Sequence, residues 1–262
     1  MKLCADTISD LLPEDSLFAG KLLVEDCVDS TNTQLKAMAA AGAPEGTILL
    51  AEEQTGGRGT RGRSFCSPRG EGLYLSVLLR PRAELSDLVQ LTGWVAVAAR
   101  RAVERACGAP AQIKWLNDLY LNGRKLCGIL TELSLNSDNR PAHVVVGIGV
   151  NVSQTADTFR AQGLEGIATS LAAEGYSVDR NRLCACLLEE LDMMYRLFPD
   201  GQSVYLEEYR KFCLTPGREV TFEEGGQTLR GSALSVDDEF GLVVRGEDGS
   251  RRTVFTGTVS LV

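Results

Sequence analysis

The most concentrated positive charge in the sequence lies in a glycine-rich segment that follows an apolar run. Residues 54–70 contain four arginines and no acidic residue, although the whole chain has a formal charge of −8. Glycine lets backbone N–H groups approach an anion closely, and arginine supplies forked donors to phosphate or carboxylate oxygens. The segment therefore predicts an anion site, although a solvated loop or a short RNA contact would have the same composition. The arginines are Arg58, Arg61, Arg63 and Arg69.

A polar cluster at residues 29–32, Asp-Ser-Thr-Asn, lies at a predicted strand-to-helix junction. All four residue types favour the N-cap of a helix, and capping by itself explains the cluster. In the functional interpretation, the hydroxyl and amide groups face a polar, uncharged group of a ligand, such as a urea. The cluster alone does not distinguish the two interpretations.

Residues 114–118, Lys-Trp-Leu-Asn-Asp, form a third candidate region together with Lys125. Asn122-Gly123 between two strand-like runs is a strong hairpin signal, and a hairpin brings Lys125 back near Asp118. Such a group of cations beside a carboxylate suits an ion pair or a phosphate with its Mg²⁺. A surface hairpin with alternating charges is the structural alternative.

The segment at residues 147–151, Gly-Ile-Gly-Val-Asn, is the fourth candidate region. Glycines at alternate positions share one face of a strand and leave it bare, so a flat ligand or another backbone can lie close. A β-bulge would explain the same glycines. Asn151 then offers an amide at the end of the strand.

The four candidate regions lie at the ends of predicted strands and helices, which the hydrophobic periodicity of the sequence indicates. Apolar runs predict strands, spacing of three and four predicts helices, and five short strands after residue 216 predict a small barrel. We expect an α+β fold, with a mixed sheet and helices on one side in residues 1–214 and a β barrel in residues 215–262. The predicted strands are 21–28, 47–53, 73–80, 113–116, 119–121, 124–133, 143–152 and the five of the barrel, and the predicted helices are 33–41, 84–106, 169–174 and 181–198.

Composition excludes several classes of protein. The negative net charge and the pI near 4.9 argue against a coat for nucleic acid or anionic membrane. The apolar runs are too short to span a bilayer, and residues 1–10 do not resemble a signal peptide. The eight cysteines include no CxxC pair, and His143 is the only histidine, which weakens catalytic triads and histidine-rich metal sites. We expect a reduced, cytoplasmic protein.

Taken in order, five segments resemble the biotin–protein ligases, specifically the bacterial biotin–[acetyl-CoA-carboxylase] ligases. The resemblance spans residues 20–262, and it implies a class II synthetase-like catalytic domain followed by an SH3-like C-terminal domain. The segments that carry it are 29–32, 54–63, 114–118, 124–130 and 147–151.

The resemblance implies two half-reactions. Biotin and Mg-ATP give biotinyl-5′-AMP and pyrophosphate, and a lysine of a biotin carboxyl carrier protein then takes the biotinyl group and releases AMP. Mg²⁺ would accompany ATP, with no protein ligand identified. The implied partners are biotin, ATP and the carrier protein, with a homodimer possible and no membrane.

The resemblance also implies roles for individual residues. Lys125 and Arg58 would stabilise the charges of the reacting groups, and Asp118 would orient or deprotonate the incoming lysine. The implied biotin-binding residues are Ser30, Thr31, Asn32, Gln54, Gly57, Gly59, Thr60, Lys125, Gly128 and Gly149. The implied ATP-binding residues are Arg58, Arg61, Arg63, Phe65 (stacked on adenine), Lys114, Asn117 and Asn151.

The sequence departs from the family pattern at four places. Thr60 replaces an arginine that helps to retain the acyl-adenylate, so leakage of biotinyl-AMP is expected unless Arg61 reaches in. Leu116 replaces a proline, and Phe65 replaces a tryptophan that would stack more strongly. Only 28 residues precede Asp29, too few for a helix-turn-helix domain, and we expect no binding to DNA.

Two other functions remain open from the sequence. A lipoate or octanoate–protein ligase performs the same adenylation, and the Gly-Arg-Gly loop and the C-terminal barrel favour biotin over it. A non-enzymatic module could use the arginine loop to bind RNA, but the net charge of the chain disfavours that function.

Overall fold

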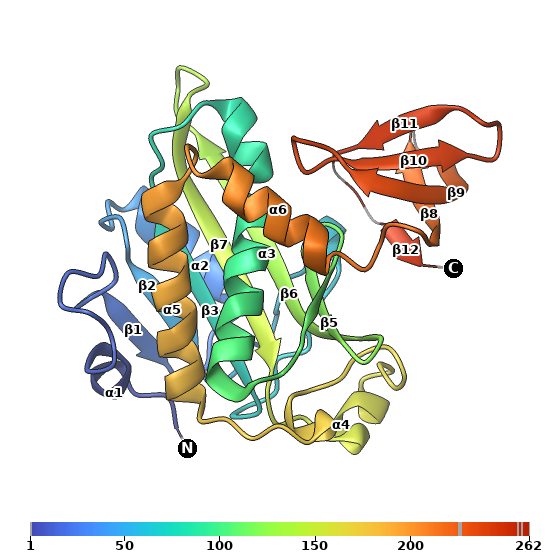
Figure 1. Cartoon of the computed structure of the whole chain (residues 1–262). Coiled ribbons are helices and arrows are strands. Elements are labelled where there is room, and N and C mark those ends of the chain that lie inside the picture. Colours follow the sequence, from blue (N-terminus) through green and yellow to red (C-terminus); the bar gives the residue numbers. More distant parts are fainter. Residues whose placement is uncertain (1, 225–226, 256, 258, 262) are drawn as a thin grey trace.

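Two β-sheets organise the chain, a larger one in the first two thirds and a smaller one at the C-terminal end (Figure 1). The structure is a computed structural model, and it describes residues 2–224, 227–255, 257 and 259–261. The larger sheet has seven strands in the order β1-β2-β3-β7-β6-β5-β4, and the smaller has five in the order β11-β10-β9-β8-β12. Strands β1 and β2 are parallel, and all other neighbouring pairs are antiparallel. The larger sheet is therefore mixed, as expected.

The elements follow one another along the chain with short connections. The strands are β1 Leu22–Glu25, β2 Ile48–Ala51, β3 Gly72–Leu79, β4 Gln112–Lys114, β5 Asp118–Leu121, β6 Arg124–Leu135, β7 Pro141–Asn151, β8 Glu219–Glu224, β9 Gln227–Val236, β10 Leu242–Gly246, β11 Arg251–Val254 and β12 Val259–Leu261. The α-helices are α1 Ala5–Ser9, α2 Thr31–Ala40, α3 Leu85–Cys107, α4 Ala156–Ala161, α5 Arg180–Leu197 and α6 Gln202–Phe212, and two 3₁₀ turns are Thr60–Gly62 and Ala172–Glu174.

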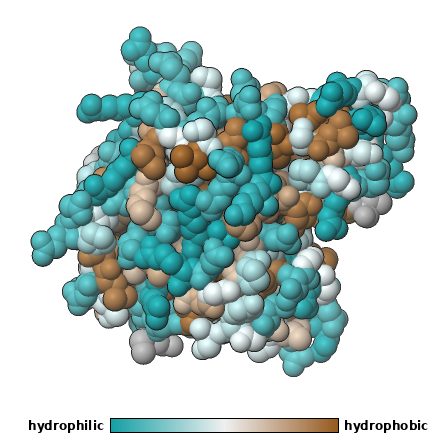
Figure 2. All heavy atoms as spheres, viewed as in Figure 1, coloured by the Kyte–Doolittle hydropathy of each residue, from teal (hydrophilic) through white to brown (hydrophobic). Residues whose placement is uncertain are grey.

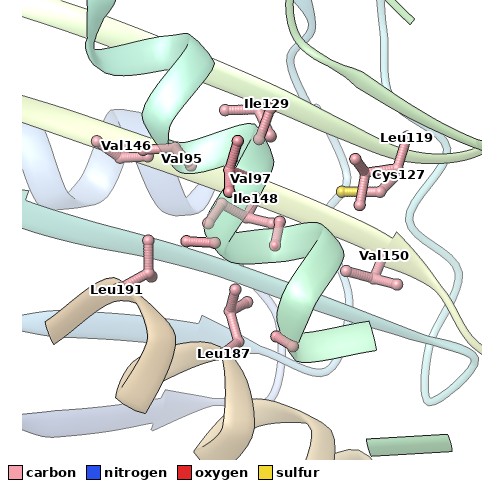
Figure 3. Close-up of a cluster of buried hydrophobic side chains, with 14 of the residues drawn as sticks. Val95, Val97, Leu119, Cys127, Ile129, Val146, Ile148, Val150, Leu187 and Leu191 are labelled. Atoms are coloured by element: carbon pink, nitrogen blue, oxygen red, sulfur yellow. The ribbon is translucent and has the colours of Figure 1, made fainter. Parts of the chain in front are cut away.

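The long helices α3 and α5 cover one face of the larger sheet, and their apolar side chains form the main core. Figure 3 shows Val95 and Val97 of α3 and Leu187 of α5 packed over Ile148 of β7 and Ile129 of β6. All five side chains are almost completely buried. Removal of this apolar surface from water is the dominant stabilising contribution to the fold.

Helix α2 is the exception to the expected arrangement of helices on one side. It packs against the opposite face of the sheet, where Leu35 and Ala39 contact Leu49, Leu78 and Val145 in a second, smaller cluster. Strand β3 is consequently buried along its whole length, because both of its faces are covered. The expected α+β class is confirmed, and the face that α2 only partly covers remains available for a binding site.

Several element boundaries follow directly from capping residues. The Thr33 N–H donates to the Ser30 side chain, so α2 begins two residues before the predicted start. Gly108, with φ of 74°, ends α3 in the left-handed conformation. The predicted helix at 169–174 is wrong except for a 3₁₀ turn at its end, and α1, α4 and α6 lie outside the predicted helices. All five predicted barrel strands are present, although residues 256, 258 and 262 lie outside the described residues.

Phe240 is one of the residues that join the barrel to the rest of the protein. Phe240 precedes β10, and its ring packs so closely on Gly93 of α3 that a Cβ at Gly93 would lie 2.4 Å from Phe240 Cδ1. The Phe240 carbonyl accepts a hydrogen bond of 2.8 Å from Trp115 Nε1, in the turn between β4 and β5. The barrel therefore holds the segment that carries Lys114 and Asp118.

The visible surface is mostly hydrophilic. Figure 2 shows apolar side chains in small groups, separated by hydrophilic ones, on the face that carries α3, α5 and α6. Of the helices that the structure describes, none is both long and apolar enough to cross a bilayer.

The Gly93 contact predicts a specific cost of substitution. Gly93→Val should destabilise the protein by about 1–3 kcal/mol, because the added methyl groups have no space beside the Phe240 ring. Chemical denaturation measures the free energy of unfolding, and Ser86→Ala, at an exposed position of the same helix, is the control. Equal stability of Gly93→Val and the wild type would show that the joint with the barrel does not depend on this close contact.

Candidate functional site

A pocket opens on the α2 face of the larger sheet, between the start of α2, the arginine loop, the β5–β6 hairpin and the barrel. Most residues predicted for binding or catalysis line it. Its lining comprises Ser30, Thr31, Asn32, Gln54, Arg58, Gly59, Thr60, Arg63, Ser64, Phe65, Leu75, Lys114, Trp115, Asn117, Asp118, Lys125, Gly128, Ile129, Leu130, Gly147, Ile148, Gly149, Gly257 and Val259.

Strand register explains why these residues meet. Lys114 is paired with Asp118, Asp118 with Gly128, and Gly128 with Gly149, so the four lie in one row across strands β4, β5, β6 and β7. Residues in directly opposite positions share a face of a sheet. The charged end of the row lies at the hairpin and the bare end lies at the centre of the sheet.

The bare end of the row is covered by the Phe65 ring. A Cβ at Gly149 would lie 2.5 Å from Phe65 Cε1, and one at Gly128 would lie 3.2 Å from Phe65 Cε2. Only glycine therefore permits the ring, or a flat ligand, to approach the backbone here. The ring predicted to stack on adenine thus lies against the two glycines predicted to contact biotin.

The N-terminus of α2 supplies a buried polar network beside these glycines. The Thr31 backbone N–H and hydroxyl both donate to Gln54 Oε1, at 2.9 and 3.1 Å. The Ser76 hydroxyl donates to Asn32 Oδ1 at 2.5 Å, and Asn32 is itself packed onto Gly147. Hydrogen-bonded groups in a buried network have fixed orientations, so this end of the pocket is preorganised for a polar, uncharged group.

Lys125 and Asp118 form the central ion pair of the pocket. The distance from Lys125 Nζ to Asp118 Oδ1 is 2.6 Å, and the Asp118 side chain is only 14% exposed. A β-bulge between Leu119 and Tyr120 places Leu126 as an extra residue of β6, so that Lys125 and Gly128 face the same side. The predicted hairpin is confirmed, and the bulge is the feature that aims Lys125 into the pocket.

Lys114, at the charged end of the row, is a second cation of the pocket. Its Nζ lies 5.6 Å from the centre of the Tyr120 ring. Burial lowers the pKa of Lys114 below its ordinary value of 10.5, Lys125 and Arg63 add to the lowering, and Asp118 opposes it. Burial also raises the pKa of Tyr120 to about 12, with a contribution from Asp118. Burial is thus the main cause of both shifts, and the neighbouring charges make smaller contributions.

The arginine loop brings two of its cations to the pocket. Arg63 and Arg58 line it, and Arg58 also contacts Glu132 of β6, with 3.3 Å between NH1 and Oε1. Together with Lys114 and Lys125, they give the lining four cationic side chains and one carboxylate, Asp118. The excess of positive charge suits ligands that carry more than one negative charge.

Three predicted site residues do not line the pocket. Arg61, with φ of 58°, forms an ion pair with Glu223 of β8 in the barrel. Asn151 is buried, and its amide donates to the Thr169 carbonyl at 2.9 Å. Gly57 packs against the Phe65 carbonyl within the loop. Arg61 therefore binds the barrel, Asn151 supports the segment beside Lys125, and Gly57 shapes the loop.

Other residues of the site were not among the predicted ones. Gly147 had a signal, because it belongs to the alternating glycines. Ser76 is a single serine in a largely apolar strand, and Glu132 is one of several polar residues of β6, so neither stood out in the sequence. Gly257 and Val259 reach the pocket from the barrel. Contacts between the barrel and the pocket depend on how two distant parts of the chain pack together, so no local pattern in the sequence predicts them.

The donor set suits anions better than a metal held by the protein. The described residues contain no group of three or more His, Cys, Asp or Glu side chains placed to hold a metal ion. Asp118 is already paired with Lys125. Magnesium prefers phosphate oxygens, waters and one or two free carboxylates, so a nucleotide would have to bring most of its ligands.

Family comparison assigns both parts of the chain. Residues 24–151 match the model of the biotin/lipoate A/B protein ligase family, and residues 215–262 match that of the biotin protein ligase C-terminal domain. The bifunctional ligase/repressor BirA of Bacillus spizizenii is 35% identical over 242 residues, which cover 92% of this chain and 74% of that protein. The biotin–[acetyl-CoA-carboxylase] ligase of Mycobacterium tuberculosis is 36% identical over 221 residues, with coverage of 80% and 77%.

A solved structure agrees with these matches. The biotin protein ligase from Aquifex aeolicus, in complex with biotin and ATP, superposes with a TM-score of 0.76 at 27% identity. The superposition covers 93% of this chain and 99% of that one. The similarity thus includes both sheets.

The electrostatics of the pocket predict the response of Lys114 to a neighbour. In Asp118→Asn, the pKa of Lys114 should fall further, because the carboxylate that favours its charged form is removed. NMR titration of the lysine side chains measures the shift, with Asp157→Asn, at an exposed and distant site, as the control. An unchanged or raised pKa of Lys114 would contradict the assigned geometry.

Proposed function

The chain belongs to the biotin/lipoate A/B protein ligase family, and from that premise we propose how its pocket joins biotin to a lysine of a biotin carboxyl carrier protein. The reaction proceeds through biotinyl-5′-AMP and consumes ATP. The observation that carries the proposal is the Lys125–Asp118 ion pair, 2.6 Å long, within a pocket that three further cations line. The C-terminal domain match and the relatives named for biotin favour biotin over lipoate or octanoate.

The first half-reaction joins two anions. A carboxylate oxygen of biotin attacks the α-phosphorus of ATP, the bond from that phosphorus to the bridging oxygen breaks, and pyrophosphate leaves. Lys125 and Arg58 are proposed to lie at the carboxylate and the α-phosphate, where they offset the repulsion between the two groups and the charge that develops in the transition state. Lys114 and Arg63 are proposed to hold the departing phosphates.

The polar and bare parts of the pocket are proposed to divide the substrates between them. The network of Thr31, Asn32 and Gln54 would receive the ureido ring of biotin, and its chain would run over the face of Gly128 and Gly149. ATP would lie toward the hairpin and the arginine loop. Phe65 lies between the part of the pocket proposed for biotin and the part proposed for ATP. We therefore propose that its ring contacts biotinyl-AMP, at either its biotinyl or its adenosine part. The remaining proposed contacts are Ser30, Gly57, Gly59, Thr60 and Lys125 for biotin, and Arg61, Asn117 and Asn151 for ATP or for the segments that hold it.

Asp118 is proposed to act in the second half-reaction. The ε-amine of the carrier lysine attacks the carbonyl carbon of biotinyl-AMP, the bond to the phosphate oxygen breaks, and AMP leaves. The amine must lose a proton as the amide forms, and Asp118 is the carboxylate of the pocket lining that can orient it or accept the proton. Asp118 is paired with Lys125, so the residues proposed for the two half-reactions lie next to each other in the pocket.

Magnesium and the barrel complete the proposal. Mg²⁺ would enter with ATP, because the pocket is cationic and offers no free carboxylate cluster among the described residues. We propose that residues 1–214 carry the pocket and residues 215–262 close its edge through Gly257 and Val259. We propose that the reaction takes place in the cytoplasm, where ATP and the acceptor protein are supplied.

Release of pyrophosphate distinguishes the candidate acids. Biotin should stimulate ATP-dependent pyrophosphate release by the full chain, and lipoate and octanoate should not. Stimulation by lipoate or octanoate alone would identify a different acyl substrate, and salt-sensitive RNA binding without any biotin-dependent reaction would indicate a binding module.

Two substitutions test the electrostatic roles. Lys125→Ala and Arg58→Ala should each slow adenylation by roughly 10²-fold, as expected for removal of a group that stabilises charge in the transition state. Arg69→Ala is the matched control, because Arg69 lies in the same loop but pairs with Glu53 outside the pocket. Normal rates in both test variants, with unfolding temperatures unchanged, would refute the assigned roles.

A further inference from the structure

Glu132 lies on β6, on the same face of the sheet as the pocket floor, and neither the family pattern nor the reaction assigns it a role. Its register partner is Val145, just as Leu130 is paired with Gly147 and Gly128 with Gly149. The alternation of side chains along β6 therefore directs Glu132 toward α2 and the arginine loop. Its side chain is only 17% exposed.

Three donors from two other segments converge on this carboxylate. Lys36 Nζ lies 2.9 Å from Oε1, and Asn32 Nδ2 donates to Oε2 at 3.0 Å. Arg58 NH1 lies 3.3 Å from Oε1 and 3.4 Å from Oε2. Burial works to raise the pKa of Glu132, but the bonds from Asn32 and Lys36 outweigh it and lower the pKa, so the carboxylate is charged at neutral pH.

The contact with Arg58 differs from the other two. Asn32 and Lys36 belong to a regular helix, whereas Arg58 lies in a glycine-rich loop, where only an isolated bridge to Ser64 holds its backbone. The Arg58 side chain is 46% exposed, and such a long side chain must lose conformational freedom before it can act on a substrate. Glu132 is the one carboxylate within ion-pair distance of Arg58 among the described residues.

The Glu132 contact leaves Arg58 able to bind a second anion. It uses a single terminal nitrogen, NH1, and a guanidinium has five N–H donors in a planar fork. Lys36 lies closer to the carboxylate, at 2.9 Å against 3.3 Å for Arg58, so the two cations share the charge of Glu132. Glu132 therefore holds Arg58 at the pocket without neutralising it.

We propose that Glu132 is a positioning residue that docks Arg58 against β6, so that the loop presents its cation to the carboxylate of the acid substrate. The role rests on the proposed adenylation of biotin and adds a residue to it. Loss of the Glu132 carboxylate should weaken the productive binding of biotin. The Arg58 side chain would then lose its conformational entropy when biotin binds, and this loss would reduce the free energy of binding.

A double-mutant cycle in the full chain tests this role. Glu132→Gln should raise the KM for biotin in pyrophosphate release about tenfold, which is the scale of one hydrogen bond to a charged group, and should leave kcat within about twofold. In an Arg58→Ala background, the same substitution should have little further effect. Glu132→Asp, which keeps the charge, should recover part of the loss.

Lys36→Met is the matched control, because Lys36 is the other cation on the same carboxylate and does not line the pocket. It should leave the KM for biotin within about twofold. An equal tenfold effect of Glu132→Gln with and without Arg58 would overturn the proposal, since Glu132 would then act through α2. A lower KM in Glu132→Gln would also overturn it, because the carboxylate would then compete with the substrate.

The cycle also separates this role from the proposed function. A wild-type chain without any biotin-dependent pyrophosphate release would refute the adenylation itself. An active wild type with additive effects of Glu132→Gln and Arg58→Ala would refute only the role of Glu132. Unfolding temperatures of the five variants (the two single mutants of the cycle, the double mutant, Glu132→Asp and Lys36→Met) show whether any loss reflects the fold. Glu132→Asp keeps the test decisive if Glu132→Gln is unstable.

Discussion

The ion pair between Lys125 and Asp118 is the interaction on which the proposed site depends, because it fixes a cation at the point where we propose that the two anions meet. The pair exists only because the β5–β6 hairpin is bulged, since regular alternation would send Lys125 to the opposite face from Gly128. The backbone of Lys125 is held further by hydrogen bonds with Ile167 and Thr169. The start of β6 is thus held by β5 on one side and by residues 167–169 on the other. The free energy needed to orient the Lys125 charge is therefore spent during folding instead of during the reaction.

The rest of the pocket serves the ligands around this pair. Paired glycines on β6 and β7 clear a flat surface at the centre of the sheet, and the start of α2 supplies polar groups beside it. This arrangement requires α2 to lie on the face opposite α3 and α5, because the long helices would fill the space that a ligand needs. The barrel contributes through Phe240, whose carbonyl holds Trp115, and through Arg61, which Glu223 binds. Arg61 is therefore bound to the barrel and does not line the pocket in place of the arginine that Thr60 replaces.

Local features of the site could be predicted from the sequence, and features set by long-range packing could not. The Ser30 cap, the Asn122-Gly123 hairpin and the alternating glycines each depend on a few neighbouring residues, and the structure confirms the cap and the hairpin. The side of the sheet that α2 occupies, the partner of Arg61 and the burial of Asn151 depend on segments far apart in the chain. Glu132 gave no local signal, because β6 contains several other polar residues, and its partners come from α2 and the arginine loop.

One pocket is proposed both to make biotinyl-AMP and to pass the biotinyl group to a protein. Intact-mass analysis of a biotin carboxyl carrier domain, incubated with the full chain, ATP, Mg²⁺ and biotin, tests this proposal directly. We expect the carrier to gain the mass of one biotinyl group, on a single lysine, and we expect the gain to require both ATP and biotin. An unchanged carrier mass, in a sample where the chain is folded and a known ligase modifies the same carrier, would contradict it.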